Sequence, residues 1–334
     1  MDTLETLTQQ IMDGHQVTRE EALWLSKQPL EHLCRQADRI RRHFCKNTFD
    51  LCTIINGKSG RCSENCKFCA QSAHNHTDAD TYPLLSKEEI LADAKKQAAQ
   101  GILRYSIVTA GKALSDAEID IMCNTIRQIR QETTLSVCVS FGLLTESQFR
   151  RLKNAGVSRV HNNLETSERH FPNICTTHTF ADKVSAIQAA QQAGLTVCSG
   201  GIMGMGETMA DRIDMALALR GLGITSVPVN VLNPIPGTPF GEYPTLSEAE
   251  VLGILALYRF LLPAASIRMA GGRGLLPDGG KSCFLSGANA AITGDMLTTA
   301  GITAQTDLQM LTELGYEVKL DETTDDHRHG HGRG

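Results

Sequence analysis

Short apolar runs alternate with longer amphipathic runs from about residue 50 onward. Short apolar or alternating runs are typical of β-strands, whereas apolar residues three or four positions apart over a longer stretch indicate a helix. The pattern predicts strands at 51–56, 103–109, 135–140, 158–164, 195–202, 226–232, 264–270 and 287–293. It predicts helices between them, among them 87–100, 115–132, 145–155, 180–193, 208–222 and 246–262.

Strands that alternate with helices are typical of parallel strands joined by crossover helices. Most of the predicted strands follow a turn that contains glycine, such as Ala193-Gly194, as expected where a helix ends. The number of predicted strands favours an α/β fold, a closed (β/α)8 barrel of the TIM type. An open or partial barrel with fewer strands fits the same pattern, and the strand at 287–293 has the weakest signal.

The two ends of the chain differ from this repeating part. Residues 1–48 have a helical pattern, and Thr18 followed by Glu21 is typical of a capping box at a helix start. We therefore predict an N-terminal helical extension over 1–48 and the barrel over 49–320. The polar segment 321–334, rich in glycine and histidine, is predicted to be a disordered tail.

Composition excludes several classes of function. The chain has 334 residues, 41% hydrophobic and 21% charged, which is ordinary for a globular protein. It contains no apolar run of about 18 residues and no basic and apolar N-terminal signal, so we expect a cytoplasmic protein without a membrane partner. The net charge of −5, without a basic stripe, argues against a nucleic-acid partner.

Three of the eleven cysteines, Cys62, Cys66 and Cys69, form a C-x3-C-x2-C motif. The motif follows the first predicted strand, where a barrel places its active-site loops. Three thiolates can hold three irons of a [4Fe–4S] cluster and leave the fourth iron open, whereas ferredoxin-type clusters need a fourth cysteine. A zinc site of three cysteines and one histidine, with His74 or His76 as the last ligand, is the alternative.

The motif, with Phe68 directly before its last cysteine, resembles the signature of the radical S-adenosylmethionine (SAM) superfamily. The resemblance implies a [4Fe–4S] cluster whose open iron binds SAM. It also implies that a 5′-deoxyadenosyl radical, formed from SAM, removes hydrogen from unactivated carbon. Phe68 would then line the adenine pocket, although it could also be a core aromatic residue.

Further segments resemble biotin synthases, a family within that superfamily. They are 62–72 (CSENCKFCAQS), 161–167 (HNNLETS), 197–202 (VCSGGI), 204–208 (GMGET), 237–239 (GTP) and 283–289 (CFLSGAN). The resemblance implies insertion of sulfur into dethiobiotin, with the sulfur drawn from an auxiliary iron–sulfur cluster deep in the barrel. It also implies a homodimer and a flavodoxin or ferredoxin as the electron donor.

The resemblance assigns roles to single residues. Asn163 would contact dethiobiotin, and Asn230 fits a second position near this substrate. Glu165, where the family usually has Asp, would contact the SAM ribose, and Ile202 would lie in the same cofactor site. Lys183 stands where an Arg commonly meets the SAM carboxylate, so the charge is kept but the bidentate fork is lost.

One face of the fourth predicted strand is polar. By alternation it carries Arg159, His161, Asn163 and Glu165. A polar face that points into a barrel is more typical of a ligand site than of a solvated surface. His161 stands where the family often has Asn, so its role is open.

The chain departs from the better-known biotin synthases at the auxiliary cluster. In those enzymes three cysteines and one arginine hold a [2Fe–2S] cluster. Cys138, Cys198 and Arg268 match three of these positions, but Ser106 occupies the fourth, and serine is a poor iron ligand beside thiolates. Either the auxiliary cluster is lost or it is built differently.

Barrel geometry offers a replacement, because interior side chains form layers that alternate strands supply. Cys138, Cys198 and Arg268 lie on the third, fifth and seventh predicted strands, and the first strand carries Cys52. We predict an auxiliary cluster held by Cys52, Cys138 and Cys198, with Arg268 adjacent. Three thiolates and an open iron favour a four-iron cluster over [2Fe–2S]. Cys52 could instead be a small buried hydrophobe, and Cys175 is a reserve ligand.

Two other readings stay open at this point. The first is a related radical SAM maturase or mutase, of the hydrogenase-cofactor maturase or methylornithine synthase type. The interior residues Cys138, Cys198 and Arg268 argue against a pure mutase, which does not need them. The second is a non-catalytic protein that binds a cluster or zinc.

Overall fold

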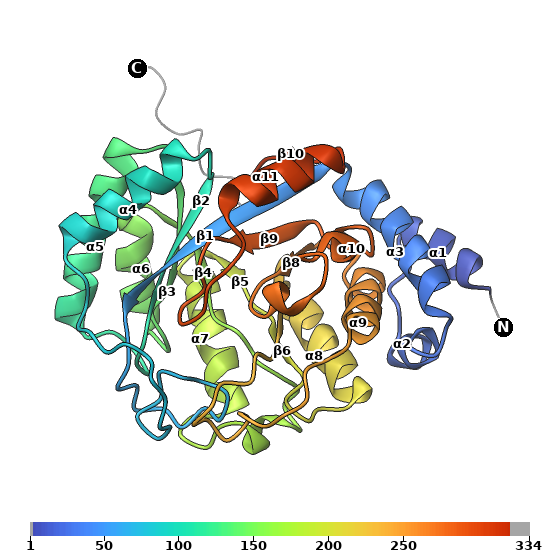
Figure 1. Ribbon diagram of the computed structural model, residues 1–334, viewed down its shortest axis with the longest axis horizontal. Helices are drawn as coiled ribbons and strands as arrows, with labels where there is room; N and C mark the ends of the chain where they lie inside the picture. The colour runs from blue at the N-terminus through green and yellow to red at the C-terminus, as the bar shows by residue number, and fades with distance from the viewer. Residues whose placement is uncertain (1–2, 321–334) are drawn as a thin grey trace.

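A closed barrel of parallel strands forms the centre of the computed structural model, which describes residues 3–320 (Figure 1). Its strands are β1 (Thr48–Lys58), β2 (Arg104–Thr109), β3 (Ser136–Ser140), β4 (Val157–His161), β5 (Thr196–Cys198), β6 (Gly201–Met203), β7 (Ser226–Val231), β8 (Ser266–Met269) and β9 (Ala290–Thr293). β9 pairs with β1, with Cys52 opposite Ile292, and this pairing closes the barrel. The predicted (β/α)8 fold is confirmed, and the segment 321–334 lies outside the described residues.

Helices cover the outside of the barrel, as expected for crossover connections. They are α4 (Lys87–Ala99), α5 (Asp116–Glu132), α6 (Glu146–Ala155), α7 (Phe180–Gln192), α8 (Met209–Gly221) and α9 (Glu248–Leu261). Each begins after a serine or threonine whose side chain accepts a hydrogen bond from the backbone N–H of the third helical residue. The side chain of that third residue in turn accepts the backbone N–H of the serine or threonine. Such capping boxes satisfy backbone N–H groups that a helix start otherwise leaves without a partner.

Three helices precede the barrel: α1 (Leu4–Met12), α2 (Arg19–Leu25) and α3 (Leu30–Cys45). They lie beside α8 and α9 at the right of Figure 1, and α3 buries Leu33, Ala37 and Ile40 on one face. The capping box of Thr18 and Glu21 is present at the start of α2. None of the helices within residues 3–320 is long and apolar enough to cross a membrane.

The predicted strand 195–202 is interrupted at Ser199 and Gly200, which separate β5 from β6. A Cβ on Gly200 would lie 1.9 Å from the carbonyl oxygen of Pro228, so this backbone packs against β7 more closely than a side chain allows. The predicted strand 158–164 was too long, because β4 ends at His161. Asn163 and Glu165 therefore belong to the loop that follows β4.

The structure also contains elements that the pattern did not predict, most of them in the C-terminal part. They are η1 (Phe171–Asn173), η2 (Arg273–Leu275), α10 (Lys281–Phe284), α11 (Ala304–Glu313) and β10 (Glu317–Val318). β10 is parallel to the beginning of β1, with Glu317 opposite Thr48, and so extends the sheet beyond the barrel.

Candidate active site

A cavity of about 350 Å³ lies inside the barrel and brings most of the predicted site residues together. Its wall includes Cys52, Phe68, Cys69, Cys138, Arg159, His161, Asn163, Glu165, Cys198, Ile202, Asn230 and Arg268. The residues of the strands supply the floor, and loops such as 296–299 supply the rim. The polar face that the sequence predicted for 159–165 does line the cavity, although its last residues are in a loop.

Three buried arginines surround one carboxylate at the floor of the cavity. Asp50 Oδ2 lies 3.2 Å from Arg104 Nε, 3.3 Å from Arg159 Nη1 and 3.0 Å from Arg268 Nη2. Burial raises the pKa of Asp50, but the three guanidinium groups outweigh burial and hold this pKa well below its usual range. Arg268 is fixed further, because its Nη1 donates to the backbone oxygens of Asp50 and Ala291.

This floor was not predicted as a unit, since Asp50 and Arg104 were not singled out. Asp50 precedes Cys52 by two positions on β1, so both side chains point into the barrel. Three guanidinium groups therefore meet one carboxylate in a buried place. Guanidinium groups also stabilise other anionic groups beside them. A ligand with negative charge, such as a thiolate-bound iron–sulfur cluster, fits next to this floor.

The three cysteines of the predicted auxiliary site, Cys52, Cys138 and Cys198, are buried and line the cavity above this floor. The Cys138 sulfur lies 3.7 Å from Arg104 Nη1, and Ser226 Oγ donates to the Cys198 sulfur at 3.3 Å. Ser106 also lines the cavity and is paired in register with Cys138. Buried thiols beside guanidinium groups fit an anionic cluster.

Burial and charge affect the three thiols unequally. Burial raises the pKa of Cys52 to about 12, and the nearby Arg268 offsets this only in part. Burial also raises the pKa of Cys198, but a hydrogen bond with His161 and the charges of His161, Arg268 and Arg159 lower it to about 6. His161, whose role was open, therefore interacts with a predicted cluster ligand.

The loop with Cys62, Cys66 and Cys69 folds back on itself after β1. The Cys62 N–H donates to Gln71 O at 3.0 Å, and the Cys69 N–H donates to Cys66 O at 3.2 Å. Asn75 Nδ2 donates to the carbonyl oxygens of Cys66 and Cys69, at 3.2 and 2.8 Å. These bonds hold the three cysteines on one tight turn at the edge of the cavity, which Phe68 and Cys69 line.

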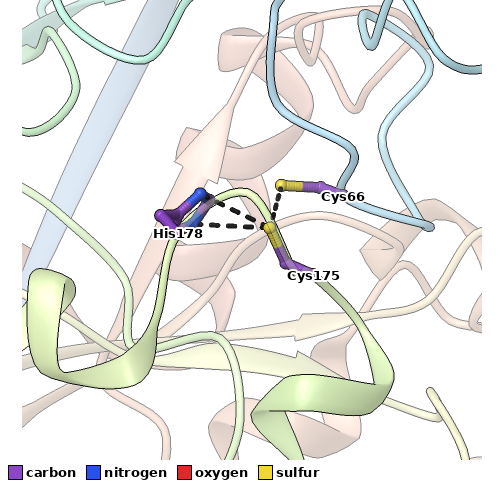
Figure 2. A group of neighbouring side chains, drawn as sticks. All are labelled: Cys66, Cys175 and His178. Atoms are coloured by element: carbon purple, nitrogen blue, oxygen red, sulfur yellow. Dashed lines mark hydrogen bonds between the residues drawn. The ribbon is translucent and has the colours of Figure 1, made fainter.

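Cys66 also approaches a second loop, which contains Cys175 and His178 (Figure 2). Its sulfur lies 3.7 Å from that of Cys175, which in turn lies 3.4 Å from His178 Nδ1. Within residues 3–320, these three residues form the group of Cys, His and acidic side chains close enough to hold one metal ion. The histidines of the zinc alternative are not part of it: His74 Nε2 bonds to Ser63 O at 3.1 Å instead.

The residues predicted to contact SAM lie where the loop after β4 meets β6. Glu165 has a left-handed backbone, with φ of 70°, and its carbonyl oxygen accepts the Ile202 N–H at 2.9 Å. A Cβ on Gly201 would lie 2.3 Å from that oxygen, so this close approach of the two backbone segments requires glycine at position 201. Lys183 Nζ lies 3.3 Å from Asn162 Oδ1, beside the same loop.

The two asparagines predicted for the substrate site hold the backbone around them. Asn163 Oδ1 accepts the Gly200 N–H at 3.1 Å, and its Nδ2 lies 3.3 Å from Glu165 Oε2. Asn230 donates to Gly201 O at 3.0 Å and accepts the Gly271 N–H at 2.9 Å. Both side-chain amides therefore stabilise the backbone around them, in addition to any contact with a substrate.

A parallel barrel with a three-cysteine loop after its first strand defines the class. The model of the Radical SAM superfamily matches residues 28–219, and that of the Biotin and Thiamin Synthesis associated domain matches 228–317. The solved structure of a methylornithine synthase has a TM-score of 0.82 at 20% identity, covering 94% of this chain and 97% of that one. A maturase of the [FeFe]-hydrogenase has a TM-score of 0.81 at 17% identity, covering 93% and 74%. The chain belongs to the radical SAM superfamily.

Curated relatives narrow this class. A biotin synthase of Brachyspira hyodysenteriae is 58% identical over 320 residues, which cover 96% of each chain. One of Akkermansia muciniphila is 56% identical and covers 96% of this chain and all of its own. The chain belongs to the biotin synthase family. The maturase and the methylornithine synthase share the fold at far lower identity, so the alternative reading is not favoured.

Proposed function

We propose that this protein converts dethiobiotin to biotin by radical chemistry, with sulfur supplied from an auxiliary iron–sulfur cluster. The observation that carries the proposal is that three buried thiols and Arg268 face the same cavity as the SAM-site residues Phe68 and Glu165. A site for carbon–hydrogen cleavage and a site for sulfur donation need to share one enclosed space, because the substrate carbon must meet both.

Different residues of the chain would bind the SAM cluster, SAM and dethiobiotin. Cys62, Cys66 and Cys69 would hold a [4Fe–4S] cluster, which with bound SAM supplies a 5′-deoxyadenosyl radical. Glu165 and Lys183 would orient SAM through its ribose and its carboxylate. The remaining predicted residues of the two sites would be Phe68 and Ile202 beside SAM, and Asn163 and Asn230 beside dethiobiotin. The barrel would keep water away from the reacting groups.

The auxiliary cluster would be held by Cys52, Cys138 and Cys198, with Arg268 adjacent. The guanidinium groups beside the three thiols support an anionic cluster here, and three thiols support the four-iron type over [2Fe–2S]. Iron and sulfide analysis after anaerobic reconstitution should find about eight irons per chain. About six would indicate a [2Fe–2S] auxiliary cluster, and about four would rule the second cluster out.

A matched pair of variants tests the role of Cys52. Cys52→Ser should lose the auxiliary iron and keep the SAM cluster, whereas Cys123→Ser, on the buried face of α5, should keep both. The double variant Cys52→Ser/Ser106→Cys should regain iron, since Ser106 lines the same cavity. Full iron content in Cys52→Ser would show that Cys52 is a packing residue.

The activity has a direct test. Reduced, reconstituted protein with SAM should form 5′-deoxyadenosine in the presence of dethiobiotin, together with biotin. Cleavage of SAM that dethiobiotin does not increase would contradict the proposal and would favour a maturase or mutase. We further propose a homodimer in the cytoplasm that receives electrons from flavodoxin or ferredoxin; native mass and stimulation by each reduced donor test these two points.

A further inference from the structure

The group of Cys66, Cys175 and His178 has the dimensions of a tetrahedral metal site (Figure 2). In a zinc site, bonds of about 2.3 Å to sulfur and about 2.0 Å to nitrogen place two sulfurs about 3.8 Å apart and sulfur and nitrogen about 3.6 Å apart. Here the two sulfurs lie 3.7 Å apart, and Cys175 Sγ lies 3.8 Å from His178 Nε2. All three ligand atoms lie within 4.8 Å of one another.

A carboxylate orients the histidine of this group. Glu64 Oε2 lies 2.6 Å from His178 Nδ1, and both side chains are buried. His178 Nδ1 lies 3.4 Å from Cys175 Sγ but is bound to Glu64, so Nε2, at 3.8 Å, is the nitrogen that can bind a metal. A carboxylate on the far nitrogen of a metal-bound histidine is a common arrangement, because it fixes the ring and makes the ligand more basic.

Asn65 fastens the two loops of the group together. Its Oδ1 accepts the backbone N–H groups of Thr176 and Thr177, at 2.9 and 3.2 Å, and its Nδ2 donates to Thr176 Oγ1 at 2.7 Å. The loop of Cys66 and the loop of Cys175 are therefore joined independently of any sulfur contact. The proposed ligands are therefore held close together before a metal ion binds.

We propose that the chain, before it acquires its clusters, binds one Zn²⁺ ion between Cys66, Cys175 and His178. Two thiolates and one imidazole suit zinc, and the fourth position stays open to water. Each thiol that binds releases its proton to solvent. If Cys66 is a ligand of the SAM cluster, as proposed above, the zinc ion excludes that cluster, because one thiolate cannot serve both.

Cobalt replaces zinc as a probe with a visible spectrum. The cluster-free full-length chain, kept reduced and free of oxygen, is titrated with Co²⁺. We expect one equivalent to give tetrahedral ligand-field bands with a thiolate-to-cobalt charge-transfer band, both removed by Zn²⁺. Cys175→Ser should abolish this equivalent, and Glu64→Gln should weaken it by about 10- to 100-fold.

Cys62→Ser is the matched control, because it lies in the same cysteine motif but outside the three-residue group. It should bind cobalt as the unchanged chain does. Equal loss in Cys62→Ser and Cys175→Ser, or unchanged binding in Cys175→Ser, would overturn the proposal. The first result would assign the cobalt to a site that also needs Cys62, and the second to the cysteine motif alone or to other groups such as the histidine-rich segment 321–334. Far-ultraviolet circular dichroism checks that each variant is folded.

Competition with the cluster gives a second readout. Chain loaded with one equivalent of Zn²⁺ should incorporate iron and sulfide into the SAM site several-fold more slowly than metal-free chain. Cys175→Ser should remove this delay while keeping Cys62, Cys66 and Cys69. A delay of the same size in Cys175→Ser would also overturn the proposal. Neither measurement needs dethiobiotin, so a failure here is distinguishable from a failure of the proposed activity.

Discussion

Asp50→Asn would remove the carboxylate that Arg104, Arg159 and Arg268 share at the floor of the barrel. The change keeps the size and shape of the side chain, so its effect is electrostatic. Asp50 is 1% exposed and each guanidinium lies within 3.3 Å of its Oδ2. Water therefore has little access to replace the lost charge.

Removing one partner of a buried ion pair typically costs about 3–5 kcal/mol of folding free energy, because the other charge is left uncompensated. For a chain of this length, such a loss corresponds to a fall in the unfolding temperature of about 4–7 °C. We expect this loss in the cluster-free protein. It should be smaller when both proposed clusters are loaded, because iron-bound thiolates beside Arg268 would provide negative charge in place of Asp50.

The assay is anaerobic thermal unfolding of Asp50→Asn and the unchanged chain, each with and without clusters. Asp307→Asn is the matched control, since Asp307 forms a buried pair with Arg273 at 2.6 Å but lies on α11, outside the cavity wall. It should lose the same stability in both forms. An equal loss for Asp50→Asn with and without clusters would refute the idea that the floor serves an anionic cluster.

Substitutions at three further positions, one of them with a matched control, test the residues around the proposed SAM and substrate sites. Gly200→Ala should lower the unfolding temperature and weaken SAM binding, because its Cβ would clash with Pro228 O, whereas Gly221→Ala, with open space around it, should change neither; equal behaviour of the two would contradict the close approach. Asn230→Ala should cost about 1–3 kcal/mol of stability even without ligands, since two backbone groups lose their partner, and an unchanged denaturation midpoint would show that water replaces it. Glu165→Asp should retain SAM binding and Glu165→Gln should weaken it, as measured by equilibrium binding; equal affinities would show that the carboxylate charge is not used.

The barrel could be predicted because its signal is local. The sequence pattern within a short segment is sufficient to indicate each strand and each capped helix. The three cysteines of the motif, Cys62, Cys66 and Cys69, also lie on one loop. Alternation along β3 places Cys138 at the cavity and Val137 and Val139 in the apolar layer under the helices. Where the pattern failed, at Ser199 and Gly200, the cause was a backbone contact with β7 that periodicity does not report.

The features that could not be predicted depend on contacts between distant segments. Cys66 and Cys175 are 109 positions apart and meet because Asn65 joins their loops. Asp50 and Arg159 are also 109 positions apart, and the register of the strands between them decides whether they pair. Charged residues at inward positions of a strand are nevertheless a usable signal, because a buried charge needs a partner.

The proposal that Cys52 supplies the thiol that position 106 lacks follows a rule of the fold. Neighbouring barrel strands send side chains into different layers, and alternate strands share one. Cys52 on β1 therefore shares the layer of Cys138 on β3 and Cys198 on β5, whereas Ser106 on β2 belongs to the other layer. Both positions face the cavity. Cys52 lies two positions after Asp50 on β1, and the Asp50 carboxylate pairs with Arg268, so a cluster bound through Cys52 would lie close to the charges of the floor. These charges, in addition to the number of thiols, should therefore determine which cluster the proposed site holds.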